Sequence, residues 1–175
     1  GSRGCPAGVS VQKWQACHDL GADPAINYRT QDFVAESKAL TDEQGPDVIL
    51  DMVGGDYIAR NLEAIAVDGR IAQIAFLGGA KAEVDFTPLL MKRVTLTGST
   101  LRARPIEMKA KLAEALRAKV LPLIETGKVK PLIDSVFSFE DVREAHARMD
   151  AGTHIGKIVL SMQQEEDKPN KGARA

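Results

Sequence analysis

Residues 47–55 read Asp47-Val48-Ile49-Leu50-Asp51-Met52-Val53-Gly54-Gly55 and decide the fold class. The stretch is a nearly continuous apolar run stopped by a glycine pair, which is typical of a parallel strand covered on both faces. Residues 70–76 and 94–98 are also predicted to be strands, and each is followed by small residues. Helix-like segments alternate with these strands, so the pattern predicts an α/β fold with crossover helices.

The other elements follow from periodicity and capping signals. We expect helices at residues 10–20, 32–40, 57–65 and 106–126, and a helix carrying Phe139, Val142 and Met149. Strands are expected at residues 25–28, 134–139 and 156–161. Ser10 and Asp32 are expected to cap the first two helices. The polar residues 163–175 are predicted to be a disordered tail.

The composition predicts a soluble globular protein that uses neither metal nor nucleic acid. Of 175 residues, 44% are hydrophobic, and 23 basic against 24 acidic residues leave a net charge of -1. No apolar run is long enough for a membrane helix and no signal segment opens the chain, so we expect a cytoplasmic protein. The two cysteines form no CxxC, and with three histidines they make a poor zinc framework. The chain begins with Gly1-Ser2 rather than Met, which suggests a processed chain or a piece of a longer one.

Small residues follow three successive predicted strands, at Gly54-Gly55, Gly78-Gly79 and Gly98-Ser99-Thr100. Ligands of an open parallel sheet bind beyond the carboxyl ends of its strands, and glycine lets a flat ligand or a phosphate approach the backbone. Any one of these pairs could equally make only a tight turn. Three in register favour a binding site.

Basic residues near the start of the chain favour NADP over NAD. Lys13 lies in the first turn of the first predicted helix, and Tyr28-Arg29 follow the next strand, where a Rossmann-type sheet places the adenosine ribose. Cationic groups suit a 2′-phosphate, whereas a carboxylate is usual for NAD, and no Asp or Glu occurs in the first twelve residues. A solvated surface position is the equally weighted alternative for Lys13 and Arg29.

Four stretches, taken in order, resemble the C-terminal half of NADPH-dependent quinone oxidoreductases, the zinc-independent branch of the medium-chain dehydrogenase/reductase superfamily. They are residues 21–29, 47–55, 96–102 and 154–160. The resemblance implies hydride transfer from NADPH to a quinone or a similar activated double bond. It assigns Lys13 and Tyr28 to the 2′-phosphate, and Val53, Gly54, Phe76, Leu77 and Gly78 to the loops that meet the cofactor. Ser99 and Leu101 would lie toward the nicotinamide, and catalytic residues stay unknown.

The same resemblance implies an incomplete Rossmann-type doubly wound parallel sheet. Residues 1–133 would form a partial NADP-binding domain, and residues 134–162 a segment that normally returns to a GroES-like domain. Without the first Rossmann strand, the edge at residues 48–52 should be exposed. We expect this chain alone to bind NADPH weakly and to reduce nothing.

Family dimers pair through an edge strand that corresponds to Val94 to Gly98, so a homodimer is expected. Alternative interpretations are a catalytically silent fragment or dimerisation module, and another medium-chain reductase such as an enoyl reductase or an alcohol dehydrogenase.

Overall fold

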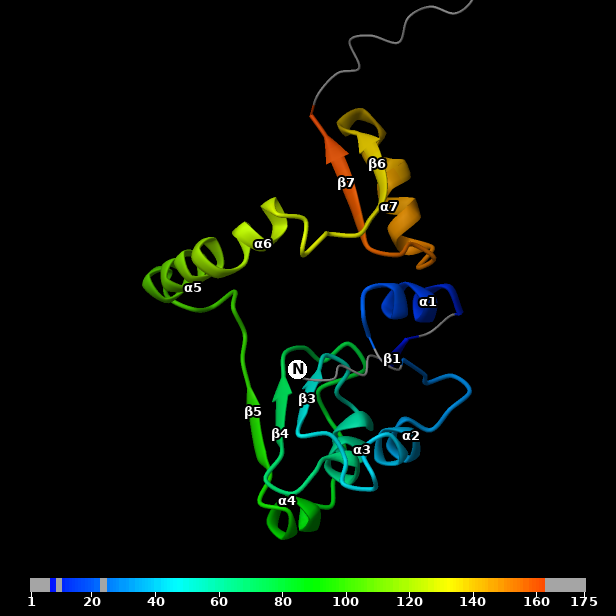
Figure 1. The fold of residues 1–175 in the computed structure, drawn as a ribbon, viewed down its shortest axis with the longest axis vertical. Coiled ribbons are helices and arrows are strands. Elements are labelled where there is room, and N and C mark those ends of the chain that lie inside the picture. The colour runs from blue at the N-terminus through cyan, green and yellow to red at the C-terminus, as the bar shows by residue number, and fades with distance from the viewer. Residues whose placement is uncertain (1–6, 9–10, 23–24, 163–175) are drawn as a thin grey trace, which may run out of the picture. The chain divides into compact units, whose positions relative to one another are not determined.

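The computed structural model describes residues 7–8, 11–22 and 25–162. The chain divides into two compact units, Gly1–Ala110 and Lys111–Ala175, and Figure 1 labels most of their elements. The described strands form three separate sheets, and every pair within them is parallel. The predicted α/β class with parallel pairing is therefore confirmed.

The largest sheet lies in the first unit. It consists of β3 (Val48–Asp51), β4 (Arg70–Gln73) and β5 (Thr95–Gly98), in that spatial order, with α3 (Tyr57–Ala64) and α4 (Thr87–Met91) in the connections. The register sets Val48 beside Arg70 and Arg70 beside Thr95. Because the strands are parallel and in register, the loops that follow them share one edge, which we call the carboxyl edge.

The core of the first unit lies where α3 covers one face of this sheet. Leu62 and Ile65 of the α3 segment are fully buried and pack with Ile71 and Val94. Their spacing of three residues places them on one side of the helix. Each such buried side chain contributes about 1.5–3 kcal/mol relative to an exposed one, so α3 fixes the sheet and the loops at its ends.

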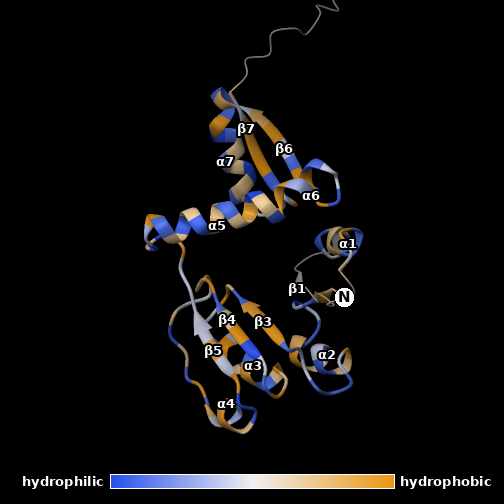
Figure 2. Cartoon of the chain, turned by 60° about the vertical axis from the view of Figure 1, so that its left-hand side comes forward, coloured by the Kyte–Doolittle hydropathy of each residue, from blue (hydrophilic) through white to orange (hydrophobic). Residues whose placement is uncertain are grey.

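The outer side of β3 is an open edge. The described part of the chain places no strand there, and Val48 and Leu50 are 64% and 60% exposed. They alternate with Ile49, which packs against the core on the opposite face. Figure 2 shows the strand as mainly hydrophobic. Of residues 48–52, which were expected to be exposed, Val48, Leu50 and Met52 are exposed, whereas Ile49 is half-buried and Asp51 is buried.

A shorter strand pair precedes this sheet. β1 (Ala7–Gly8) pairs with β2 (Ile26–Asn27), and α1 (Val11–Asp19) connects them. The indole Nε1 of Trp14 donates a 2.6 Å hydrogen bond to the carbonyl oxygen of Ala25, which ties α1 to the start of β2. The strand expected at residues 25–28 is thus only two residues long.

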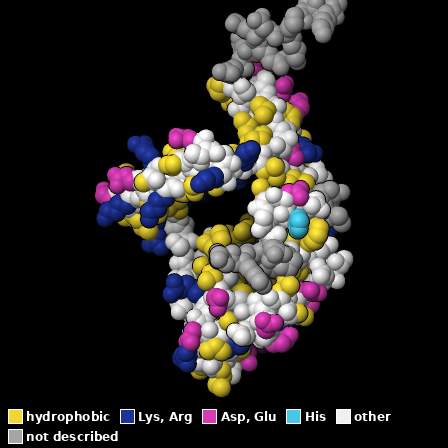
Figure 3. All heavy atoms as spheres, viewed as in Figure 1, with side chains coloured by type: hydrophobic (Ala, Val, Ile, Leu, Met, Phe, Trp, Pro, Cys, Tyr) yellow, Lys and Arg dark blue, Asp and Glu magenta, His cyan; other side chains and the backbone are white. Residues whose placement is uncertain are grey.

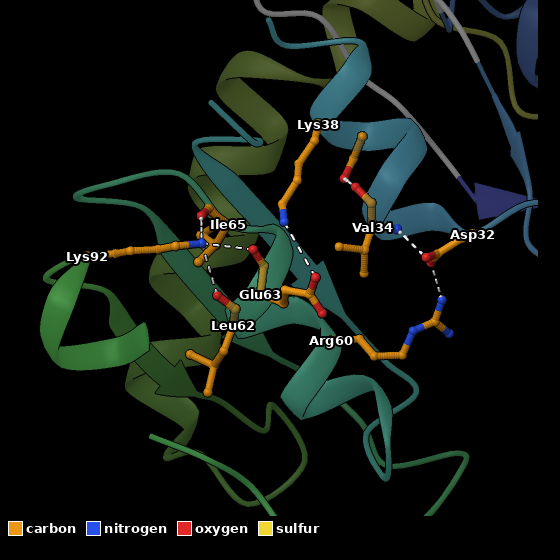
Figure 4. A network of polar contacts seen from close by, with 9 residues as sticks. Asp32, Val34, Lys38, Arg60, Leu62, Glu63, Ile65 and Lys92 are labelled. Atoms are coloured by element: carbon orange, nitrogen blue, oxygen red, sulfur yellow. Dashed lines mark hydrogen bonds and ion pairs between the residues drawn. The ribbon is translucent and has the colours of Figure 1, made fainter. Parts of the chain in front are cut away.

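Helix α2 (Phe33–Ala39) begins as predicted, because the Asp32 carboxylate accepts a 3.1 Å bond from the Val34 N–H. The predicted Ser10 cap lies outside the described residues. Arg60 of α3 donates to the same carboxylate at 2.7 Å, as Figure 4 shows, and its guanidinium lies 4.3 Å from the centroid of the Phe33 ring. The Arg60 bond first, and the Val34 N–H second, lower the pKa of Asp32. Since β2 and β3 do not pair with each other, the contact between α2 and α3 links the two sheets of this unit.

The later part of the chain is α5 (Ile106–Lys119), α6 (Leu121–Glu125), β6 (Ile133–Ser138), a 3₁₀ turn (Phe139–Asp141), α7 (Val142–Asp150) and β7 (Lys157–Ser161). The single helix expected at residues 106–126 is wrong, since α5 and α6 are separate. Pro122 has no N–H to donate and disfavours helical geometry in the residue before it. Gly127, with φ +70°, ends α6.

Helix α5 is exposed along its length, with Lys109 alone half-buried. Figure 3 shows Lys and Arg side chains gathered on it. None of the helices in the described part of the chain is both long and apolar enough to span a bilayer.

The β6–α7–β7 segment is fastened by Asp134 and Arg148. The Asp134 carboxylate accepts bonds from Arg148 Nη2 at 2.9 Å, Arg148 Nε at 3.0 Å and the Ile155 N–H at 2.9 Å. The Arg148 bonds first, and the Ile155 N–H second, hold the pKa of Asp134 well below its usual range.

Candidate functional site

The loops after β3 and β4, residues 52–56 and 74–80, lie side by side at the carboxyl edge, and we call them the paired loops. The N–H of Gly78 donates to the carbonyl oxygen of Val53 at 2.7 Å, and the N–H of Gly55 donates to that of Gly79 at 2.8 Å. A further 3.0 Å bond runs from the Leu77 N–H to the Met52 carbonyl oxygen. The loops therefore continue the pairing of the strands and act as one backbone surface.

Close contacts between the loops favour glycine at residues 54, 55 and 78, whereas a Cβ at Gly79 would meet nothing within 4 Å. Gly54 has φ +69°, and a Cβ there would lie 2.6 Å from the carbonyl oxygen of Gly79. A Cβ at Gly78 would lie 3.1 Å from Cγ1 of Val53. Because the N–H groups of Gly54, Gly55, Gly78 and Gly79 all bind acceptors within the chain, they are not a ready phosphate cradle. Because these glycines have no side chain, the two loops can pack closely against each other.

A buried polar network at the ends of β3 and β4 supports the paired loops. Asp51, Asn61 and Gln73 are 4%, 3% and 8% exposed. The Asp51 carboxylate accepts from the Val53 N–H at 2.6 Å, and from Nδ2 of Asn61 at 3.0 Å. These three residues were not among the predicted site residues. The signal that could have revealed them is a charged residue within the apolar run 48–53.

The outer surface of the paired loops is apolar. Phe76 is 50% and Leu77 81% exposed, while Val53 is half-buried between the loops. Ser99 adjoins them, since its N–H donates to the carbonyl oxygen of Gln73 at 3.0 Å. Leu101, 58% exposed, follows in the next turn. The structure thus brings together the predicted site residues of the paired loops, with Ser99 at their margin.

Lys13 and Tyr28 lie on a different part of the first unit. Lys13 is half-buried in the first turn of α1, and Tyr28 is 39% exposed directly after β2. Asn27 orders the turn that carries Tyr28, because its carbonyl oxygen accepts from the Thr30 N–H at 3.1 Å and its side-chain Oδ1 from the Arg29 N–H at 3.1 Å. These two candidates therefore belong to the β1–β2 pair and not to the sheet of the paired loops.

The paired loops offer little acid–base or metal chemistry of their own. Asp56 is their one ionisable side chain. In the part of the chain that the structure describes, no three His, Cys, Asp or Glu side chains are grouped so that they could hold a metal ion. The paired loops therefore present an apolar surface with a single carboxylate, that of Asp56.

A separate cleft of about 540 Å³ opens at the amino ends of the same strands, away from the paired loops. It is lined by Lys38, Glu43, Gln44, Asp47, Ala66, Val67 and Lys92. The Lys92 ammonium donates to the carbonyl oxygens of Leu62, Glu63 and Ile65. Burial first, and the nearby charge of Lys38 second, lower the pKa of Lys92. Since its donors already serve α3, Lys92 is a structural residue of this cleft.

Comparison with known proteins gives a consistent picture. Residues 20–160 match the model of a family described as zinc-binding dehydrogenase. Quinone oxidoreductase-like protein 2 from Bos taurus is 30% identical over 156 residues, which are 89% of this chain and 44% of that protein. This chain spans less than half the length of that relative.

Solved structures extend the similarity. An NAD-dependent alcohol dehydrogenase is 29% identical with a TM-score of 0.72, over 93% of this chain and 45% of that one. The CurK enoyl reductase is 25% identical with a TM-score of 0.66, over 90% of this chain and 46% of that one. The names of these proteins cover several substrates, and their shared feature is the fold described above.

Proposed function

Because the chain belongs to the zinc-binding dehydrogenase family of the medium-chain dehydrogenase/reductase superfamily, we propose that it is the nucleotide-binding part of an NADPH-dependent reductase of quinones or similar activated double bonds. The observation that carries the proposal is the pair of hydrogen-bonded loops at the carboxyl edge of β3 and β4. In open parallel sheets this edge is where nucleotide cofactors bind.

The residues present fit the two ends of such a cofactor. Lys13 and Tyr28 would hold the 2′-phosphate, since a cation and a phenolic donor suit an anionic group. Phe76 and Leu77 give the paired loops an exposed apolar surface, which suits a flat ring, with Ser99 and Leu101 toward the nicotinamide. The described residues show no cradle for the pyrophosphate, because the glycine N–H groups of the paired loops are already bonded.

Bound NADPH would supply the hydride, and this chain's residues would bind and orient it. The acceptor is proposed as a quinone, in line with the name of the relative from Bos taurus. The NAD-dependent alcohol dehydrogenase and the enoyl reductase among the similar structures keep those two reactions as alternatives.

Cofactor titration tests this proposal. Changes in the fluorescence of NADPH and of NADH on binding give the two affinities. NADPH should bind on the order of tenfold more tightly than NADH, which corresponds to the free energy of one charge-assisted contact. Lys13→Ala should abolish the preference and leave NADH binding unchanged. Arg70→Ala, which removes an exposed cation at the amino end of β4, is the matched control and should keep it. Equal affinities in the wild-type chain would contradict the assignment of NADPH.

We expect the chain by itself to bind the cofactor without turnover. The paired loops contain no ionisable side chain apart from Asp56, and proton delivery to a reduced quinone needs an acid. Quinone-dependent oxidation of NADPH above a heat-treated control would show that this expectation is wrong. A catalytically silent module is the second candidate, favoured by the exposed edge strand β5.

A further inference from the structure

We propose that Asp51 is the positioning residue of the paired loops, and that its buried carboxylate shapes the surface that a cofactor meets. The inference rests on the proposed function, because it assigns a role within that same site. It is argued from the hydrogen bonds of Asp51 and from the contacts that connect the two loops.

The Asp51 carboxylate holds the first loop against α3. It belongs to the last residue of β3 and is 4% exposed. Its Oδ1 accepts from the N–H groups of Val53 at 2.6 Å and Gly54 at 3.2 Å, and its Oδ2 accepts from Asn61 Nδ2 at 3.0 Å. Asn61 is itself buried on α3, beside the core residue Leu62. The bond from Asn61 thus ties the first loop to the helix that packs on the core of the unit.

All three of these partners are N–H donors, which explains why the residue is an aspartate. A carboxylate only accepts, so both of its oxygens can satisfy them. An asparagine would have a single acceptor oxygen for the two backbone N–H groups, and Asn61 would have to turn its amide over to accept from the new NH₂ group. Bonds to an ionised acceptor are also about twice as strong as neutral ones.

The second loop is coupled to the first through Gln73. Its Nε2 donates to the carbonyl oxygen of Asp51 at 3.3 Å and to that of Ala75 at 2.7 Å. The Gly78 N–H then bonds to the Val53 carbonyl oxygen, directly beside the amide that Asp51 holds. A change at Asp51 should therefore loosen both loops, and with them the exposed Phe76 and Leu77.

Amide hydrogen exchange measured by NMR tests the role without any ligand. In Asp51→Asn the amides of Val53 and Gly54 should exchange about tenfold faster, from the loss of one charge-assisted acceptor. Lys92→Met, which weakens α3 at the amino ends of the strands, is the control for a general loss of stability. If Lys92→Met speeds exchange at Val53 and Gly54 as much as Asp51→Asn does, the proposal is overturned.

A double variant in which residues 51 and 61 swap side chains distinguishes positioning of the loop by Asp51 from simple pairing of Asp51 with Asn61. Asp51→Asn combined with Asn61→Asp keeps a donor opposite an acceptor but moves the carboxylate from the end of β3 to α3. The melting temperature should recover, while exchange at Val53 and Gly54 stays several-fold faster than in the wild type. Full recovery of exchange would reduce Asp51 to a partner of Asn61 and overturn the proposal. Asn61→Ala, which keeps the carboxylate and removes its anchor, serves if Asp51→Asn does not fold, and unchanged loop exchange in it would count against the proposal.

Titration with NADPH links the loops to the cofactor. Affinity should fall about tenfold in Asp51→Asn and stay unchanged in Lys92→Met. Equal affinity for wild type and Asp51→Asn, with faster loop exchange in the variant, would show that Asp51 does not position the cofactor site. If the wild-type chain binds no NADPH, the proposed function fails, and the exchange measurements still decide whether Asp51 positions the loops.

Discussion

At the scale of single residues, Lys92 completes a helix that has no glycine at its end. Residue Ile65 follows α3 in an extended conformation, and the Lys92 ammonium caps the carbonyl oxygens of Leu62, Glu63 and Ile65 (Figure 4). Lys92→Met keeps the methylene stem and removes the charge and the donors. The free energy of unfolding should fall by about 1–2 kcal/mol, measured by thermal unfolding followed by circular dichroism. Lys81→Met, at an exposed position, should melt as the wild type does; equal melting of Lys92→Met would refute the cap.

Single residues of the site differ in how well the sequence predicted them. The glycines at residues 54, 55 and 78 were expected together at one edge, because parallel strands bring their carboxyl ends together, and the structure places them there. Of the two roles considered for them, the structure supports packing between loops. The charge of Asp51 within an apolar run was a signal, but the network was missed because the partners of Asp51 on other elements are distant in sequence: Asn61 is 10 and Gln73 is 22 residues away. No local pattern connects such residues.

At the scale of elements, the ion pair between Asp134 and Arg148 predicts that the β6–α7–β7 segment is sensitive to acid. The pKa of Asp134 is lowered in the folded chain, so the unfolded chain takes up a proton first as the pH falls below about 4. The stabilisation is therefore complete above that pH and is lost progressively below it. Asp134→Asn should melt lower than the wild type at pH 7, and the difference should shrink below pH 4. A difference that is the same at both pH values would contradict this role.

Elements were predictable where one signal dominated. The helix at residues 57–65 was expected as the crossover between two predicted parallel strands, and the cap at Asp32 because a side-chain acceptor precedes the turn. The predicted helix at residues 106–126 is divided near Pro122. The helical spacing of its apolar residues favoured one long helix in the prediction, although the proline was a local signal against it. The strand at residues 25–28 is short because the length of a strand depends on its neighbour. Of the residues that the structure describes, Ala7 and Gly8 are the ones that pair with it.

At the scale of the whole molecule, the remaining proposal is a homodimer through β5, whose four residues are all exposed. The N–H groups of Thr95 and Ser99 bond to β4, so by parallel alternation the N–H of Gly98 points to the open side. Gly98→Pro removes that donor, and Gly98→Ala is the steric control, because a Cβ there meets its nearest atom, the Gln73 carbonyl oxygen, at 3.7 Å. Light scattering with size exclusion should show a dimer for the wild type and Gly98→Ala, weakened on the order of tenfold in Gly98→Pro. A wild-type monomer at micromolar concentration, or equal dimers in all three, would remove β5 as the interface.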